Sequence, residues 1–186
     1  MKKIAIIYHS GYGHTAYFAQ QVAEGAASTK KVEVKIMTSE EALKNIDALS
    51  NYDGQIWGSP TYMGNVSAQF KAFMDASSKA WMTQSWKGKW AAGFTVSGSP
   101  SGDKMTTLIT LAVLAAQHGM YWMPIGVSNE VYSGTAPDQA KNRLGSSLGA
   151  MAQAANEAPE KSFVPGDLKT AFHLGQEFAE TVARRG

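Results

Sequence analysis

The stretch at residues 10–15, Ser-Gly-Tyr-Gly-His-Thr, has the residue types of an anion-binding loop. It follows an apolar run at residues 4–8 and precedes apolar residues at helical spacing, so it joins a buried strand to a helix. The first N–H groups of such a helix are free to donate, and the helix dipole favours an anion there. Gly11 and Gly13 permit positive φ, and the hydroxyls of Ser10 and Thr15 add donors. This pattern predicts a phosphate site, although turns also select glycine and serine for their geometry alone.

A dinucleotide site is the first alternative, because residues 11–16 also fit the pattern G-x-G-x-x-G/A. A dehydrogenase would need an acidic residue after the second strand, a place that Glu40 could fill. It would also need a substrate domain, for which 186 residues leave no room. A phospho-receiver would need an acidic cluster at the strand ends, whereas the first strand ends in Tyr8-His9-Ser10.

The composition is that of an ordinary globular chain with one domain, residues 1–186. Hydrophobic residues make up 44% and charged residues 17%, which excludes a disordered chain. Because there is no cysteine, disulfides, iron–sulfur clusters and thiol catalysis are excluded, and we expect a cytoplasmic protein. The net charge is +2 with scattered basic residues, so we expect no nucleic-acid partner. The first apolar run is too short for a secretory signal or a membrane span.

Strands and helices alternate along the chain, which predicts an α/β fold. We expect strands at residues 4–8, 32–37, 52–58, 90–97 and 120–127, and helices at 14–27, 40–49, 67–79, 104–118 and about 168–184. Ser39 is the expected N-cap of the second helix, and Gly119 ends the fourth. This alternation predicts a doubly wound parallel sheet with helices on both faces. Five strands suit the order 2-1-3-4-5 of flavodoxin-like sheets better than a six-stranded dinucleotide fold.

Three loops rich in glycine, hydroxyl residues and proline follow the first, third and fourth strands, at residues 10–15, 59–65 and 97–103. In this architecture they emerge at the same carboxyl edge of the sheet, near the topological switch point where ligands bind. Each loop alone is consistent with simple turn chemistry. The three together favour a ligand with a phosphate on the first loop and a flat ring between the other two, where backbone N–H groups could donate to the ring.

The loop sequences resemble those of a known family. Residues 10–15, the segment Pro-Thr-Tyr-Met-Gly-Asn at 60–65, and His118-Gly119 followed by Pro-Ile-Gly at 124–126 are similar to WrbA-type NAD(P)H:quinone oxidoreductases, which are flavodoxin-like FMN proteins. The resemblance covers most of residues 1–127. It implies that two electrons pass from NADPH or NADH through FMN to quinones or similar electrophiles in a ping-pong cycle.

The resemblance also implies roles for individual residues, although no catalytic side chain is assigned. The FMN phosphate would lie on the first loop, the isoalloxazine would lie between the other two loops, and His118 would reach the flavin from the end of its helix. Tyr12 would meet the nicotinamide nucleotide and Trp81 would line the quinone pocket. The cofactor-binding set is Ser10, Gly11, Tyr12, Gly13, His14, Thr15, Pro60, Thr61, Tyr62, Met63, Gly64, Asn65, Ser97, Gly98, Ser99, Pro100, Ser101, Gly102, Asp103 and His118.

The chain departs from the WrbA pattern in two places. Its third loop carries Pro100 and Asp103 where the family is richer in glycine, and only residues 38–51 join the second and third strands, where WrbA proteins carry a long insertion. The chain is therefore a shorter, divergent relative. Flavin sites of this class are often completed across a subunit boundary, so we expect a homo-dimer or homo-tetramer.

Several of these residues also have purely structural explanations. A histidine that ends an apolar helix, such as His118, commonly caps the last carbonyls, and His14 at a helix start commonly faces solvent. Trp81 could be an aromatic plug between helix and loop, and Trp86 and Trp90 are expected to pack in the interior. The four histidines show no metal-ligand spacing with carboxylates, so we expect no metal site.

A flavodoxin-type electron carrier that docks on protein partners is the main functional alternative. Such carriers usually present an acidic surface, whereas this chain has a net charge of +2 and an aromatic-rich segment at residues 81–90 that suits a small flat substrate.

Overall fold

The computed structural model describes residues 1–184 of the chain, and its strands form one sheet. The main path of the sheet has the order β2-β1-β3-β5-β6, with β7 also paired to β5 and β4 to β3. All pairs are parallel except β3 with β4. The strands are β1 (Lys2–Tyr8), β2 (Val32–Thr38), β3 (Gly54–Tyr62), β4 (Asn65–Val66), β5 (Trp90–Ser97), β6 (Tyr121–Trp122) and β7 (Ala150–Gln153). The parallel α/β fold is confirmed, but the prediction of five strands is wrong because the sheet has seven.

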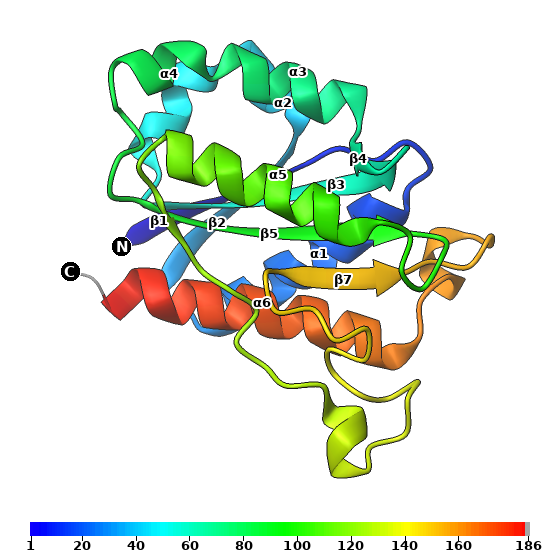
Figure 1. The fold of residues 1–186 in the computed structure, drawn as a ribbon. Helices are drawn as coiled ribbons and strands as arrows, with labels where there is room; N and C mark the ends of the chain where they lie inside the picture. Colours follow the sequence, from blue (N-terminus) through cyan, green and yellow to red (C-terminus); the bar gives the residue numbers. More distant parts are fainter. Residues whose placement is uncertain (185–186) are drawn as a thin grey trace.

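The predicted fifth strand at residues 120–127 is replaced by two separate segments. Pairing stops soon after β6 because Pro124 has no N–H to donate and Gly126 has a φ of +69°. Residues 123–149 then leave the sheet and project past α6 (Figure 1). β6 pairs with the beginning of β5, and β7 pairs with its end, where Ser97 lies opposite Gln153. Two separate segments of the chain, β6 and β7, therefore pair with β5 along this edge of the sheet.

Helices cover both faces of the sheet, as predicted (Figure 1). Along β1, Ile4 and Ile6 pack in the apolar core with α1 and α6, whereas Ala5 and Ile7 pack with α3 and α5 on the other face. This alternation follows the two-residue repeat of a strand that is buried on both sides. The helices are α1 (His14–Ser28), α2 (Ser39–Lys44), α3 (Ala68–Ala76), α4 (Ser78–Met82), α5 (Lys104–Gln117) and α6 (Pro165–Arg184), with 3₁₀ turns at Ile46–Asn51, Glu130–Ser133 and Pro159–Lys161.

The helices α1 and α6 approach each other closely through two glycines. A Cβ atom added at Gly25 would lie 2.0 Å from the carbonyl oxygen of Phe172, and one at Gly175 would lie 1.9 Å from that of Val22. No other residue fits at either position without moving a helix backbone. This contact fixes α1, and therefore the loop before it, against the sheet.

Several element boundaries differ from the predictions. The second helix begins at Ser39, and its N-cap is Thr38 instead of the predicted Ser39. The Oγ1 of Thr38 accepts from the N–H of Glu41 in a capping box. The predicted helix at residues 40–49 divides into α2 and a 3₁₀ turn. The predicted helix at residues 67–79 divides into α3 and α4. β3 extends to Tyr62 and β4 begins at Asn65, so only Met63 and Gly64 of the expected loop at residues 59–65 lie outside a strand. The last helix starts at Pro165. None of the helices in residues 1–184 is both long and apolar enough to cross a membrane.

The prediction of a single domain over residues 1–186 includes positions 185–186, which lie outside the described residues.

Candidate functional site

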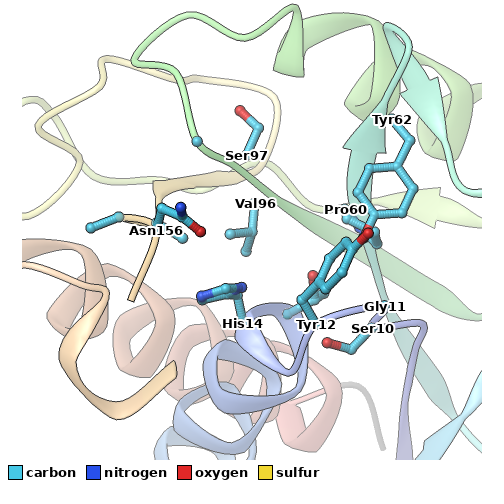
Figure 2. Close-up of a pocket in the computed structure, with 13 residues that line it drawn as sticks. Ser10, Gly11, Tyr12, His14, Pro60, Tyr62, Val96, Ser97 and Asn156 are labelled. Carbon is cyan, nitrogen blue, oxygen red and sulfur yellow. The ribbon is translucent and has the colours of Figure 1, made fainter. Parts of the chain in front are cut away.

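A cavity of about 310 Å³ lies at the carboxyl edge of the sheet, where β1, β3, β5 and β7 end (Figure 2). This volume falls within the range of small-molecule sites. The lining residues come from four segments that are distant in the sequence: Ser10, Gly11, Tyr12, His14, Thr15, Pro60, Tyr62, Val96, Ser97, Gly98, Ala154, Ala155 and Asn156. The three predicted loops do converge here, together with a fourth segment after β7.

The first loop presents unused hydrogen-bond donors to this cavity. Gly13, the N-cap of α1, has a φ of +89° and provides no side-chain cap, and the first turn contains no acidic residue. The first N–H groups of α1 therefore have no partner within the helix. The hydroxyl of Ser10 is buried and has no hydrogen-bond partner. A buried polar atom without a partner is costly, so this arrangement fits a bound anion that accepts from both the hydroxyl and the helix N-terminus.

Two tyrosines form one side of the cavity. Figure 2 shows Tyr12 and Tyr62 next to each other above Gly11. The Tyr62 hydroxyl lies so close to Gly11 that a Cβ there would come within 2.5 Å of it. Burial raises the pKa of Tyr62, with a further contribution from Tyr12, so its hydroxyl stays protonated at neutral pH. The side therefore offers aromatic surface without charge, which suits a flat ring.

β3 ends at Tyr62, and a tight turn joins it to β4 in a hairpin. Met63 and Gly64 both have positive φ, at +47° and +77°, as a two-residue hairpin turn of this type requires. The Met63 side chain is fully exposed beside the cavity rim. Neither Met63, Gly64 nor Asn65 lines the cavity. Asn65 instead accepts from Val66 N–H and from the Thr110 hydroxyl, so it holds the hairpin onto α5.

The opposite side is formed by the segment after β7, which sequence reasoning missed. His14 and Asn156 lie on this side (Figure 2), and His14 Nε2 is 2.9 Å from the carbonyl oxygen of Glu157. His14 is partly exposed and also borders the cavity, so the predicted solvent-facing side chain describes only part of its surroundings. Ala154 and Ala155 complete this side. They were missed because β7, with four residues, is too short to show a strand pattern in the sequence, and it gives the sheet a further carboxyl end at this place.

The loop at residues 97–103 contributes only its first part to the cavity. Ser97 and Gly98 line it, whereas Ser99, Pro100, Ser101, Gly102 and Asp103 do not. The loop turns back on itself because Gly102 and Asp103 both have positive φ, and a Cβ at Gly102 would lie 2.2 Å from Ser97 Oγ. Thr61 also lies outside the cavity: its buried hydroxyl bonds those of Thr95 and Thr107 and links β3, β5 and α5.

His118 follows the C-terminus of α5, a helix about 20 Å long whose N-terminus follows the third loop, and Trp81 on α4 lies close to this distant end. They line a second cavity of about 400 Å³, together with Met74, Asp75, Ser77, Ser78, Leu114 and Gln117. Within one chain, His118 therefore does not reach the cavity formed by the three loops, contrary to the prediction. The reason is that His118 follows the last residue of a 14-residue helix whose first turn follows the third loop.

The environment of His118 assigns its protonation state. Its Nε2 is 2.8 Å from Ser77 Oγ, whose own proton is donated to the Met74 carbonyl at 2.7 Å. Ser77 must therefore accept from His118, which places the imidazole proton on Nε2. Nδ1 is buried without a partner, and the ring packs on Trp86 with centroids 4.3 Å apart. Burial lowers the pKa of His118 to about 4, so the ring is neutral at physiological pH.

The remaining aromatic and histidine residues have structural surroundings. Trp86 is completely buried against Trp57 and Phe73, so its predicted packing role is confirmed, and Trp90 packs on Tyr121. Within residues 1–184, no group of three His, Asp or Glu side chains is arranged to hold a metal ion.

Comparisons with known proteins agree with this geometry. The family model described as NADPH-dependent FMN reductase matches residues 3–132. The chain belongs to this family. A curated relative, flavodoxin FldP from Pseudomonas aeruginosa, is 39% identical over 187 residues, which covers 100% of this chain and 97% of that protein. Quinone-oxidoreductase QR2 from Triphysaria versicolor is 34% identical over 197 residues, covering 95% and 93% of the two chains.

A solved structure has the same fold over the whole length. The flavodoxin, WrbA-like protein from Agrobacterium tumefaciens superposes with a TM-score of 0.77 at 35% identity and covers 100% of both chains. The resemblance to WrbA-type flavodoxin-like oxidoreductases is therefore confirmed. The family is FMN-dependent, and the cavity has the features that FMN requires: free donors for a phosphate and an uncharged aromatic side for a ring.

Proposed function

We propose that this chain is an FMN-dependent oxidoreductase that transfers two electrons from NADPH or NADH to quinones or similar electrophiles by a ping-pong mechanism. The observation that carries the proposal is the buried, unpartnered hydroxyl of Ser10 beside the uncapped N-terminus of α1. A phosphate there would accept from both without any lysine or metal ion. Membership of the FMN reductase family and similarity to a quinone oxidoreductase support the rest.

The residues of the cavity have separate roles in this proposal. The Ser10 hydroxyl and the first N–H groups of α1 hold the phosphate, while Tyr62, Pro60, Ser97 and Gly98 enclose the ring and exclude water from its sides. Bound FMN supplies the acceptance and release of two electrons, and the protein supplies position and field. Tyr12 is 80% exposed at the mouth of the cavity, where it can pack against a nicotinamide that enters from solvent. No side chain needs to act as an acid or base.

The phosphate assignment is tested by comparing FMN with riboflavin, which lacks the phosphate. A hydrogen bond to a charged group is worth about 1.5–3 kcal/mol, so Ser10→Ala should weaken FMN binding by roughly tenfold to a hundredfold and leave riboflavin binding nearly unchanged. Ser133→Ala, in the exposed 3₁₀ turn at Glu130–Ser133, is the matched control. Equal losses for the two ligands would show that residue 10 does not contact phosphate.

An electron carrier is the second candidate, and the observation that favours it is the 39% identity to flavodoxin FldP. The two functions are separated by mixing the FMN-loaded protein with NADPH or NADH under anaerobic conditions and then adding benzoquinone. An enzyme loses its flavin colour with nicotinamide and regains it with quinone. The flavin of a carrier is reduced by dithionite but by neither NADPH nor NADH.

We further propose that the protein assembles as a homo-dimer or homo-tetramer. Three apolar side chains, Met105, Ile109 and Val113, are spaced one helical turn apart on the outer side of α5 and are 45–51% exposed. Such a stripe is typical of a covered surface. The role that the resemblance implies for Trp81 and His118 also requires a second copy, because their cavity is separate from the first within one chain. Light scattering at several protein concentrations tests the assembly.

A further inference from the structure

Lys104 is a fully buried lysine directly behind the wall of the first cavity. It is the first residue of α5, and its relative exposure is 0%. Its ammonium donates to Ser97 Oγ at 2.9 Å and to the Ser99 carbonyl at 2.6 Å. Because Ser97 lines the cavity, the charge lies one hydrogen bond away from the ligand space. Lysine is seldom fully buried unless a carboxylate pairs with it. Yet none of the ion pairs among residues 1–184 includes Lys104.

A second cation, Arg143, supports the same loop indirectly, through Asp167 and through Gln153 of β7. Arg143 forms a two-pronged ion pair with buried Asp167, through Nε at 2.8 Å and Nη2 at 2.9 Å. Asp167 also accepts from the backbone N–H of Gln153, and the Gln153 side chain donates to the Gly98 carbonyl at 3.2 Å. Two cations and one carboxylate therefore lie behind residues 97–99. Arg143 and Asp167 neutralise each other at contact, so the charge of Lys104 is left without a direct partner.

We propose that Lys104 is a positioning residue for the cofactor: it holds residues 97–99 in place and, through its buried charge, which no carboxylate contacts directly, favours reduced FMN over oxidised FMN. This inference depends on the proposed function. Adding two electrons and one proton to the flavin leaves one more negative charge in the cavity. A cation behind the wall stabilises that form more than the neutral ring, by about tenfold in affinity at the effective dielectric of such sites. The hydrogen bonds of Lys104 to the Ser97 hydroxyl and to the Ser99 carbonyl fix the loop at residues 97–99, and the charge of the ammonium stabilises negative charge on the flavin.

The charge of Lys104 changes within an accessible pH range. Burial lowers its pKa to about 8, Asp167 opposes this shift, and Arg143 adds to it. The charged groups that act on it are Asp167 on α6 and Arg143 in the segment at residues 123–149, and Asp103 precedes it in the chain. Lys104 is mostly protonated at neutral pH and loses its charge as the pH rises through about 8, so its preference for reduced FMN should weaken there.

The experiment measures the two-electron midpoint potential of the FMN-loaded protein and the dissociation constant of oxidised FMN. Lys104→Met removes both the charge and the hydrogen bonds, whereas Lys104→Gln keeps a donor but no charge. Lys89→Met is the matched control, because Lys89 is a half-buried lysine that donates to the Ser50 carbonyl at the opposite edge of the sheet. Thermal unfolding of each variant shows whether it folds.

Both Lys104 variants should lower the affinity ratio of reduced to oxidised FMN by about tenfold, which corresponds to a potential about 30 mV more negative. Lys89→Met should leave the potential unchanged. In the wild-type protein the potential should fall more steeply with pH above about 8, and neither Lys104 variant should show this extra slope. Lys104→Gln should bind oxidised FMN more tightly than Lys104→Met, because it still has a donor for Ser99.

Unchanged potentials in FMN-loaded Lys104→Gln would overturn the electrostatic role, as would equal losses of affinity for the two redox states. If Lys104→Met does not fold, Lys104→Gln decides the question alone. Failure of the wild-type protein to bind FMN would instead refute the proposed function itself, and this inference with it. The binding measurement therefore separates the two failures.

Discussion

The buried imidazole of His118 should make the stability of this protein depend on pH between about pH 4 and pH 6.5. His118 is 2% exposed, its only proton is on Nε2, and Nδ1 has no acceptor nearby. Protonation must place a charge on Nδ1 in an apolar pocket against Trp86. Burial therefore lowers its pKa from 6.5 to about 4.

The sign and size of the effect follow from linkage. The unfolded chain takes up this proton near pH 6.5, whereas the folded chain takes it up only near pH 4. Between these values the unfolded state binds more protons. The contribution of neutral His118 to the free energy of unfolding is therefore complete above about pH 6.5 and is lost as the pH falls toward 4. Between about pH 7.5 and about pH 5 the loss in the free energy of unfolding is about 2 kcal/mol. That is a large part of the stability of a typical domain.

Urea unfolding of the wild type and of His118→Gln at the two pH values tests this reasoning. The variant will be less stable at both, because it loses the contact with Trp86, but its stability should change by about 2 kcal/mol less between them. His173, whose pKa is also lowered by burial, remains in both proteins and cancels in the comparison. If the variant loses as much stability as the wild type on acidification, protonation of His118 is not linked to unfolding, and burial does not lower its pKa in the folded state.

Two further predictions concern packing and substrate access. Gly25→Ala should lower the free energy of unfolding, measured with urea, by about 1–3 kcal/mol, because the added methyl group would lie 2.0 Å from the Phe172 carbonyl oxygen. Glu24→Ala, on the exposed side of α1, is the control. Equal stability of the two variants would mean that α1 and α6 can separate at no cost. Trp81→Ala should leave the FMN dissociation constant unchanged, because Trp81 does not line the first cavity. It should raise the KM for benzoquinone up to about tenfold. An unchanged KM would show that Trp81 is a packing residue only.

Much of the first cavity could be predicted from the sequence. The apolar run of β1 and the loop after it, with two glycines and two hydroxyls, identify a strand, a turn and a helix start within 13 residues. The carboxyl ends of parallel strands share one edge, so the loops after β1, β3 and β5 had to lie together once the alternation of strands and helices was recognised. Ser10, Tyr62 and Ser97 meet in the cavity for this reason.

The edge of the sheet could not be predicted in the same way. The run at residues 120–127 is apolar enough for a strand, but Pro124 and Gly126 end the pairing, and a distant four-residue segment completes the edge. A segment as short as β7 has no periodicity that distinguishes it from a loop. The side of the cavity at residues 154–156 was missed with it.

The sequence by itself determined the class of fold, the first loop and its capacity for an anion, because strand and helix periodicity and turn chemistry act between near neighbours. Only the tertiary structure decided which loop residues face the cavity, that Trp81 and His118 lie at the far end of α5, and that Lys104 is buried. His118 is defined by Ser77, 41 positions away, and the loop behind which Lys104 lies is supported by Gln153, 55 positions from Gly98. Burial and charge depend on such distant partners, and no local pattern encodes them.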